Sequence, residues 1–209
     1  MEWNWSSSTS RYGSMSDANV SIPVDLEARR EHERRKYLAL AAHAGGTYGS
    51  TNHGRFAYRL VQSFKPRPTF VVDFGCGRNL FIQHLRRLGI DGLGIDFAFP
   101  EADIVAPMHR VPVSAGIADV VTSFDALEHL LPEEVDEALD EMRRIAVPGG
   151  GFVLSICTRE SKTRVNGEGL HPTVRPLKWW LDRIGRVGTV RQGLGAPRGG
   201  YIAGVFNDA

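Results

Sequence analysis

The sequence predicts an α/β fold in which helices cover a largely parallel sheet. Short apolar runs, each long enough for a buried strand, alternate with segments whose apolar residues recur at helical spacing. The first run, TFVVDFG, ends in an acid and a glycine, which is typical of a buried strand that turns sharply into a helix. In such a fold the ligand binds at the carboxyl ends of the strands.

Length and composition narrow the class of protein. The 209 residues suit one domain with a short appendage, and a hydrophobic fraction of 42% allows a buried core, which excludes disorder throughout. Lys and Arg number 25 against 24 Asp and Glu, so charge alone indicates neither a nucleic-acid nor a membrane binder. Two cysteines are too few for a disulfide scaffold. Without a membrane span or a signal peptide, we expect a cytoplasmic protein.

Three segments are expected along the chain. Residues 1–23 are Ser-rich and lack periodicity, which predicts a flexible N-terminal arm. Residues 24–68 form a helical lead-in, and residues 69–209 form the α/β domain. Within the lead-in, a Gly-rich loop with Tyr48 and His53 has the composition of a lid over a polar acceptor.

The helices and strands follow from local signals. The lead-in helix at 25–42 carries ARREHERRK, and a second short helix follows through Phe56. A helix at 79–88 stops at Gly89, and the helix at 132–144 places acids ahead of arginines, as the helix dipole favours. A last helix is expected at 177–184. The strands are expected at 69–75, 92–96, 102–106, 118–124, 150–157, 187–193 and 199–206.

The most specific motif is VVDFGCGRN, in which a strand meets glycines before a helix. Glycines let the backbone turn sharply and approach a ligand closely. A dinucleotide fingerprint would place a third glycine at position 80, where this chain has Leu80. No Gly-Lys-Ser/Thr follows, so a P-loop is excluded. The motif therefore favours a ligand other than NAD, FAD or a nucleoside triphosphate.

Two acids accompany this loop. Asp73 precedes the first glycine, and Asp96 ends the next strand 23 residues later, about the separation of the ribose-binding acid in nucleotide-binding βαβ units. A carboxylate there can accept hydrogen bonds from both ribose hydroxyls, which suits an adenosine ligand without phosphates. The plainer interpretation is that both acids cap helices or satisfy loop amides.

These motifs resemble those of the class I S-adenosylmethionine-dependent methyltransferases. The resemblance covers about residues 69–206 and is carried by DFGCG, GID, ADVVTSFDALEHL and MRRIAVPGGGFVLSI. It implies S-adenosylmethionine as the cofactor and a Rossmann-like, seven-stranded, mostly parallel sheet with a reversed last strand and helices on both faces. It also implies an enzyme that transfers a methyl group.

The resemblance also implies roles for individual residues. The glycine loop would border the methionine part of the cofactor, Asp96 would hold the ribose, and Met108 would lie at the adenine edge, although Pro107 stands where the family often has Asp. Phe124 and Asp125 would face the methionyl end. The residues expected to bind the cofactor are Asp73, Gly75, Cys76, Gly77, Asp96, Phe97, Met108, Phe124 and Asp125.

A polar cluster follows the fourth strand and supplies the candidate catalytic residues His171, His129 and Glu128. The spacing Asp125-x-x-Glu128-His129, with His171 downstream, resembles the metal site of small-RNA 3′-terminal ribose 2′-O-methyltransferases. The alternative is a capping pair, with Asp125 as the N-cap of a helix and Glu128 at its third position. We expect the capping pair, no metal, and His171 near the pocket as a base or an acceptor contact.

The acceptor is expected to be a small polar molecule. From 159 to 198 the chain has nine Lys or Arg against three acids, which would attract a nucleic acid if this segment flanks the site. The plainer interpretation is a surface that balances the acidic helix after Pro132. Of Trp179 and Trp180, one is expected in the core and the other at the pocket. Two alternatives remain: a metal-assisted RNA 2′-O-methyltransferase, and a non-catalytic partner subunit that binds the cofactor.

Overall fold

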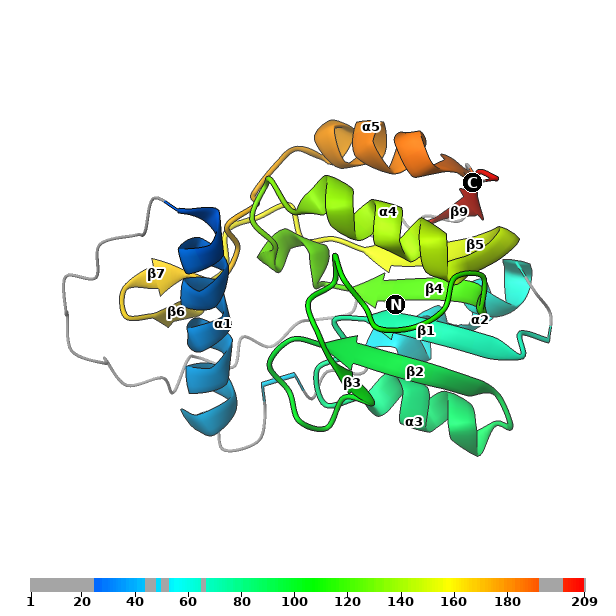
Figure 1. Cartoon of the computed structure of the whole chain (residues 1–209), viewed down its shortest axis with the longest axis horizontal. Coiled ribbons are helices and arrows are strands. Elements are labelled where there is room, and N and C mark those ends of the chain that lie inside the picture. The colour runs from blue at the N-terminus through cyan, green and yellow to red at the C-terminus, as the bar shows by residue number, and fades with distance from the viewer. Residues whose placement is uncertain (1–24, 44–47, 50–52, 65–66, 192–200, 209) are drawn as a thin grey trace, which may run out of the picture.

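A computed structural model describes residues 25–43, 48–49, 53–64, 67–191 and 201–208. The arm predicted at 1–23 lies outside these residues, as does most of the predicted lid loop. Figure 1 shows a central sheet between helices, with one further helix across the end of the sheet.

The sheet has seven strands in the order β3-β2-β1-β4-β5-β9-β8. All neighbours pair in parallel except β9, which is antiparallel to both β5 and β8. This arrangement confirms the predicted sheet with its reversed last strand. The strands are β1 (Phe70–Phe74), β2 (Asp91–Asp96), β3 (Ile104–Val105), β4 (Ala118–Phe124), β5 (Ala146–Ser155), β8 (Gly188–Val190) and β9 (Ile202–Phe206).

Helices cover both faces of the sheet because the central strands are apolar on both sides. In β1, Val71 belongs to the core cluster beneath one pair of helices and Val72 to the cluster beneath the other pair. The first face carries α2 (His53–Phe64) and α3 (Leu80–Arg87); the second carries α4 (Val135–Ile145) and α5 (Leu177–Val187) (Figure 1).

The remaining elements lie beyond the carboxyl ends of the strands. The helix α1 (Leu26–His43) stands there beside a small hairpin of β6 (Arg164–Val165) and β7 (Glu168–Gly169) (Figure 1). A single 3-10 turn, η1 (Leu127–His129), follows β4. The hairpin and η1 were not predicted, because elements of two or three residues show no periodicity. Among the described helices, none combines the length and apolarity that a membrane crossing requires.

Two arginines of the basic segment after β5 pair with acids of α4. In the described part of it, Arg186 Nη2 lies 3.5 Å from the Asp140 carboxylate of α4, and Arg183 Nε lies 3.6 Å from Asp136. This pairing agrees with a surface that balances the acidic helix. Trp180 is buried in the core as expected, whereas Trp179 packs beneath Arg183 and does not line the main cavity.

Candidate functional site

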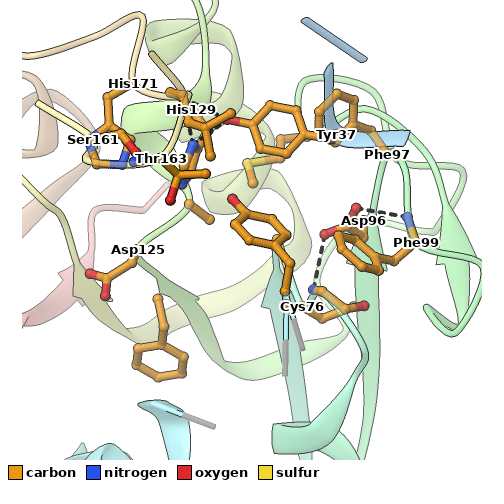
Figure 2. A pocket seen from close by; sticks show the side chains of 18 residues that line it. Tyr37, Cys76, Asp96, Phe97, Phe99, Asp125, His129, Ser161, Thr163 and His171 are labelled. Atoms are coloured by element: carbon orange, nitrogen blue, oxygen red, sulfur yellow. Dashed lines mark hydrogen bonds between the residues drawn. The ribbon is translucent and has the colours of Figure 1, made fainter. Parts of the chain in front are cut away.

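The main cavity lies at the carboxyl ends of the strands and has a volume of about 360 Å³. Eight of the nine residues expected to bind the cofactor line it, together with His129 and His171. Figure 2 shows two groups in this cavity, with Cys76, Asp96 and Phe99 on one side and the two histidines on the other. The eight residues are Gly75, Cys76, Gly77, Asp96, Phe97, Met108, Phe124 and Asp125.

The glycine loop is held against the end of β2. The backbone N–H groups of Gly75 and Cys76 both donate to the Ile95 carbonyl, at 2.8 and 3.0 Å. Gly75 has a φ of 75°, and a Cβ added there would lie 2.3 Å from the Ala126 Cβ and 2.8 Å from the Met108 Cε. Both the conformation and the space therefore require glycine at this position.

Asp96 holds the turn that follows the glycines and also faces the cavity. Its Oδ2 accepts from the Gly77 N–H at 3.0 Å, and its Oδ1 accepts from Ala98 and Phe99 at 2.9 and 3.2 Å. Burial raises the pKa of this carboxyl, while the three N–H groups act in the opposite direction. The plainer interpretation, that Asp96 satisfies loop amides, is therefore realised. Because a carboxylate offers about four acceptor positions, it can also accept from a ligand hydroxyl.

Asp73 is the exception among the expected cofactor residues, because it does not line the cavity. It is buried opposite Thr122 in the β1–β4 pair, and the Thr122 hydroxyl donates to its Oδ1 at 2.7 Å. Burial raises the pKa of Asp73 to about 7. Its observed contact is with the neighbouring strand rather than with the space where a ligand fits.

Aromatic rings close the cavity near the glycine loop. Tyr48 stacks on Phe99 with ring centroids 6.3 Å apart, and both line the cavity. The backbone carbonyls of Tyr48 and Gly49 accept hydrogen bonds from Arg78, at 3.2 and 3.1 Å. This part of the predicted lid therefore rests on the glycine loop. Residues 44–47 and 50–52 lie outside the described residues, and so does the side chain of His53.

The two histidines each direct Nδ1 at a backbone carbonyl. His129 Nδ1 lies 2.8 Å from the Leu170 carbonyl, and His171 Nδ1 lies 2.7 Å from the Arg159 carbonyl. A carbonyl oxygen only accepts, so each Nδ1 carries the proton and, in the neutral ring, Nε2 carries the lone pair. The rings meet edge to face with centroids 4.7 Å apart. Burial lowers the pKa of His129 to about 4, so this ring is neutral near pH 7.

Glu128 lies behind the histidines rather than in the cavity lining. It is completely buried; its Oε1 accepts from the Cys157 N–H at 3.0 Å, and no described residue hydrogen-bonds its Oε2. Burial raises the pKa of Glu128 to about 8. One ligand atom from each of Glu128, His129 and His171 lies within 4.8 Å of the others, so the structure brings together the three candidate catalytic residues.

The capping interpretation of this cluster is wrong. Asp125 has a φ of 47°, the N-cap of η1 is Ala126, and no side chain caps that turn. Instead, Asp125 Oδ1 accepts from the Ser155 hydroxyl at 2.9 Å, while Glu128 binds the amide of Cys157. The left-handed residue before η1 breaks the helical spacing on which the capping pair and the three-residue ligand face both depended.

Comparison with known proteins identifies the family. A family model described as a methyltransferase domain matches residues 48–190, which is more than half of the chain. The chain belongs to this methyltransferase family. The methyl donor of the family is S-adenosylmethionine, so the expected enzyme class and cofactor are confirmed. A search of curated proteins found no match to this methyltransferase.

Solved structures share the fold of the methyltransferase at low sequence identity. The 1,6-didemethyltoxoflavin-N1-methyltransferase of Burkholderia thailandensis, solved with its substrate and S-adenosylhomocysteine, is 16% identical with a TM-score of 0.68, over 90% of this chain and 94% of that chain. CalS10, an amino pentose methyltransferase from Micromonospora echinaspora solved with S-adenosylmethionine, is 15% identical with a TM-score of 0.60, over 82% and 96%. A putative methyltransferase in complex with the Haloferax volcanii activator Trm112 is 18% identical with a TM-score of 0.62, over 82% and 97%.

Several residues that line the cavity of the methyltransferase were missed by sequence reasoning. They come from α1, from the segment around the hairpin and from the turns after β2 and β4, and no motif marks them. Figure 2 shows Ser161 and Thr163 beside His171, and Tyr37 beside His129. The missed residues are Tyr37, Phe99, Ala126, Ser161, Thr163 and Leu170.

Proposed function

We propose that the protein transfers the methyl group of S-adenosylmethionine to an oxygen or nitrogen atom of a small polar acceptor, with His171 as the base. The observation that carries this proposal is a single cavity with Asp96 and the glycine loop on one side and His171 on the other. The donor would occupy the first side and the acceptor the second.

The donor side supplies groups that match the parts of S-adenosylmethionine. The Asp96 carboxylate would accept from a ribose hydroxyl, and Phe97 and Met108 would pack beside the adenine ring. The glycine loop and Asp125 would border the methionyl end, where the positively charged sulfonium favours a nearby carboxylate. We place Asp73 behind this site, as a support for the strand that carries the loop.

The acceptor side supplies a proton acceptor. Nε2 of His171 carries the lone pair because its Nδ1 is committed to the Arg159 carbonyl. In the transfer, the acceptor atom forms a bond to the methyl carbon, the carbon–sulfur bond breaks with its electrons moving to sulfur, and the acceptor proton moves to Nε2. His129 would be a weak base near pH 7, since burial lowers its pKa to about 4.

The charge of the cavity indicates what kind of acceptor it takes. Its charged side chains are Asp96 and Asp125, and among the described lining residues there is no Lys or Arg. A phosphate or carboxylate would therefore meet carboxylates and no guanidinium or ammonium partner. A neutral acceptor, or one that carries a protonated amine besides the atom that is methylated, fits better, which favours a small molecule over RNA.

Calorimetry with S-adenosylhomocysteine tests the donor side. We expect the wild-type protein to bind it and Asp96→Ala to bind about 30–100-fold more weakly, because a charge-assisted contact to the ribose is lost. Asp91→Ala, at the exposed start of the same strand, is the matched control and should keep wild-type affinity. No binding by the wild-type protein, or equal binding by Asp96→Ala, would contradict the proposal.

A divalent metal at the base is the second candidate. It is favoured by the grouping of Glu128, His129 and His171 and by the absence of a described partner for Glu128 Oε2. Two imidazoles and one carboxylate suit Mn²⁺ or a later metal better than Mg²⁺. Titration with Mn²⁺ followed by electron paramagnetic resonance separates the two candidates. Stoichiometric binding that is lost in His171→Ala would favour the metal, and no binding would favour His171 as a metal-free base.

A further inference from the structure

One wall of the cavity comes from a helix that precedes the matched family domain. The match begins at residue 48, whereas Tyr37 of α1 lines the cavity and is only 3% exposed. The Tyr37 ring meets His129 edge to face, with centroids 5.3 Å apart, and lies 5.2 Å from the Phe97 ring. Figure 2 shows its hydroxyl directed toward His129.

The same helix hydrogen-bonds three consecutive residues at the end of the hairpin. His32 Nε2 lies 2.8 Å from the Glu168 carboxylate, and Lys36 Nζ donates to the Gly169 carbonyl at 3.1 Å. The Tyr37 hydroxyl donates to the next carbonyl, that of Leu170, at 2.7 Å. His32 and Lys36 are four residues apart and Tyr37 is adjacent, so all three project from one side of α1.

The ion pairs at the contact between α1 and the hairpin are sheltered from water. Lys36 is only 6% exposed, and its ammonium lies 2.8 Å from Glu33 Oε1 and 3.4 Å from Glu168 Oε2. Removing a buried charge from its partners is costly, so α1 and the hairpin end are expected to move as one unit. Around Tyr37 the contact is completed by an apolar cluster that includes Leu40, Val165 and Leu170.

The residues that α1 hydrogen-bonds also contact both histidines, by a hydrogen bond to one and a peptide bond to the other. The Leu170 carbonyl accepts from the Tyr37 hydroxyl and also from His129 Nδ1, at 2.8 Å. His171 is the next residue in the chain. The Tyr37 hydroxyl also hydrogen-bonds His129 Nδ1 directly, so Tyr37 holds this ring both by itself and through the Leu170 carbonyl, which precedes the proposed base.

We propose that Tyr37 is a positioning residue for methyl transfer: by holding the Leu170 carbonyl and His129 Nδ1, it keeps His129 and His171 in the orientation that presents Nε2. Lys36 and His32 assist by fixing the two residues before Leu170. This inference rests on the proposed function of His171. It assigns α1 to the active site, although α1 lies outside the segment that the family model matches.

Ring-nitrogen NMR of the whole chain tests this proposal without a known acceptor. In the wild-type protein at pH 7, we expect His129 to show one protonated nitrogen, Nδ1, and one unprotonated nitrogen, Nε2. In Tyr37→Phe, which keeps the ring but loses the hydroxyl, the two signals should approach each other as both tautomers become populated. Hydrogen exchange of residues 168–171 should rise by about tenfold, as expected when one hydrogen bond is lost.

The control is Tyr58→Phe on α2, whose ring contacts His84 away from the cavity. It should leave the His129 signals unchanged, whereas a Tyr37→Phe spectrum identical to that of the wild type would overturn the proposal. If Tyr37→Phe does not fold, the same spectra are recorded for Lys36→Met, which loses the hydrogen bond to the Gly169 carbonyl. Unchanged His129 signals in that variant would likewise overturn the proposal. Calorimetry with S-adenosylhomocysteine on the wild-type protein is read separately: no binding would contradict the proposed function, while unchanged ring signals contradict only the positioning role.

Discussion

The two sides of the cavity are built in different ways. On the donor side, the glycine loop after β1 and the turn after β2 come from neighbouring strands, and most of their contacts involve backbone atoms. On the acceptor side, Tyr37, His129 and His171 come from α1, from the turn after β4 and from the segment after the hairpin, and ring contacts and long-range hydrogen bonds bring them together. The donor side is therefore a local structure, and the acceptor side depends on tertiary packing.

This difference predicts where substitutions act. A change in backbone shape on the donor side should remove cofactor binding, since the loop has one conformation available. A change on the acceptor side should alter protonation and orientation while the cofactor still binds. Three substitutions test this contrast, in order of decreasing effect.

Gly75→Val should have the largest effect. The added side chain would collide with Ala126 and Met108, and the φ of 75° is unfavourable for a β-branched residue. We expect the affinity for S-adenosylhomocysteine, measured by calorimetry, to fall by more than about 100-fold. Gly185→Ala, within α5 and with no atom within 4 Å of the new Cβ, is the control and should bind normally. Wild-type affinity in Gly75→Val would contradict the prediction that the conformation of the glycine loop determines cofactor binding.

Glu128→Gln should have an intermediate effect that depends on pH. Burial raises the pKa of Glu128 from 4.5 to about 8, so its contribution to stability is fully present below pH 4.5 and is lost as the pH rises to about 8. Glutamine does not ionise. At pH 8 the variant should therefore exceed the wild type by at least about 1 kcal/mol in free energy of unfolding, measured with urea, and the difference should shrink toward pH 5.

The control for this pH dependence is Glu133→Gln. Hydrogen bonding to Arg29 lowers the pKa of Glu133, so its contribution is present above its ordinary pKa and is lost as the pH falls. Between pH 5 and pH 8 the Glu133→Gln difference should therefore stay nearly constant, and it should change only at lower pH. A Glu128→Gln difference that stays constant from pH 5 to pH 8 would show that this carboxyl is not raised in the folded protein.

Arg186→Ala should have the smallest effect, because it lies on neither side of the cavity. Its ion pair with Asp140 joins two half-exposed side chains, and such pairs contribute about 0–1 kcal/mol. We expect little change in urea unfolding and none in the affinity for S-adenosylhomocysteine. A salt-dependent gel shift with RNA that is lost in Arg186→Ala would instead indicate that this surface binds nucleic acid.

Prediction from sequence was most accurate where the determinants are local. The strand at 118–124 was predicted with its observed bounds, since its apolar run is uninterrupted. The glycine loop and Asp96 were found because a sharp turn with close backbone contacts restricts the residue types at fixed spacing. Prediction failed at Asp125, where a helical spacing was assumed. The left-handed backbone there is accompanied by hydrogen bonds to Ser155, a residue of another strand.

The sequence by itself therefore determined the fold class, the family and the glycine turn that lines the cavity, because strand burial and glycine conformations depend on neighbouring residues. Only the tertiary structure decided which further side chains line the cavity beside the two histidines. Tyr37 lies on a largely polar helix, and its role depends on a carbonyl 133 positions away in the chain. Such a contact arises from how α1 packs on the hairpin, and neither periodicity nor local spacing encodes it.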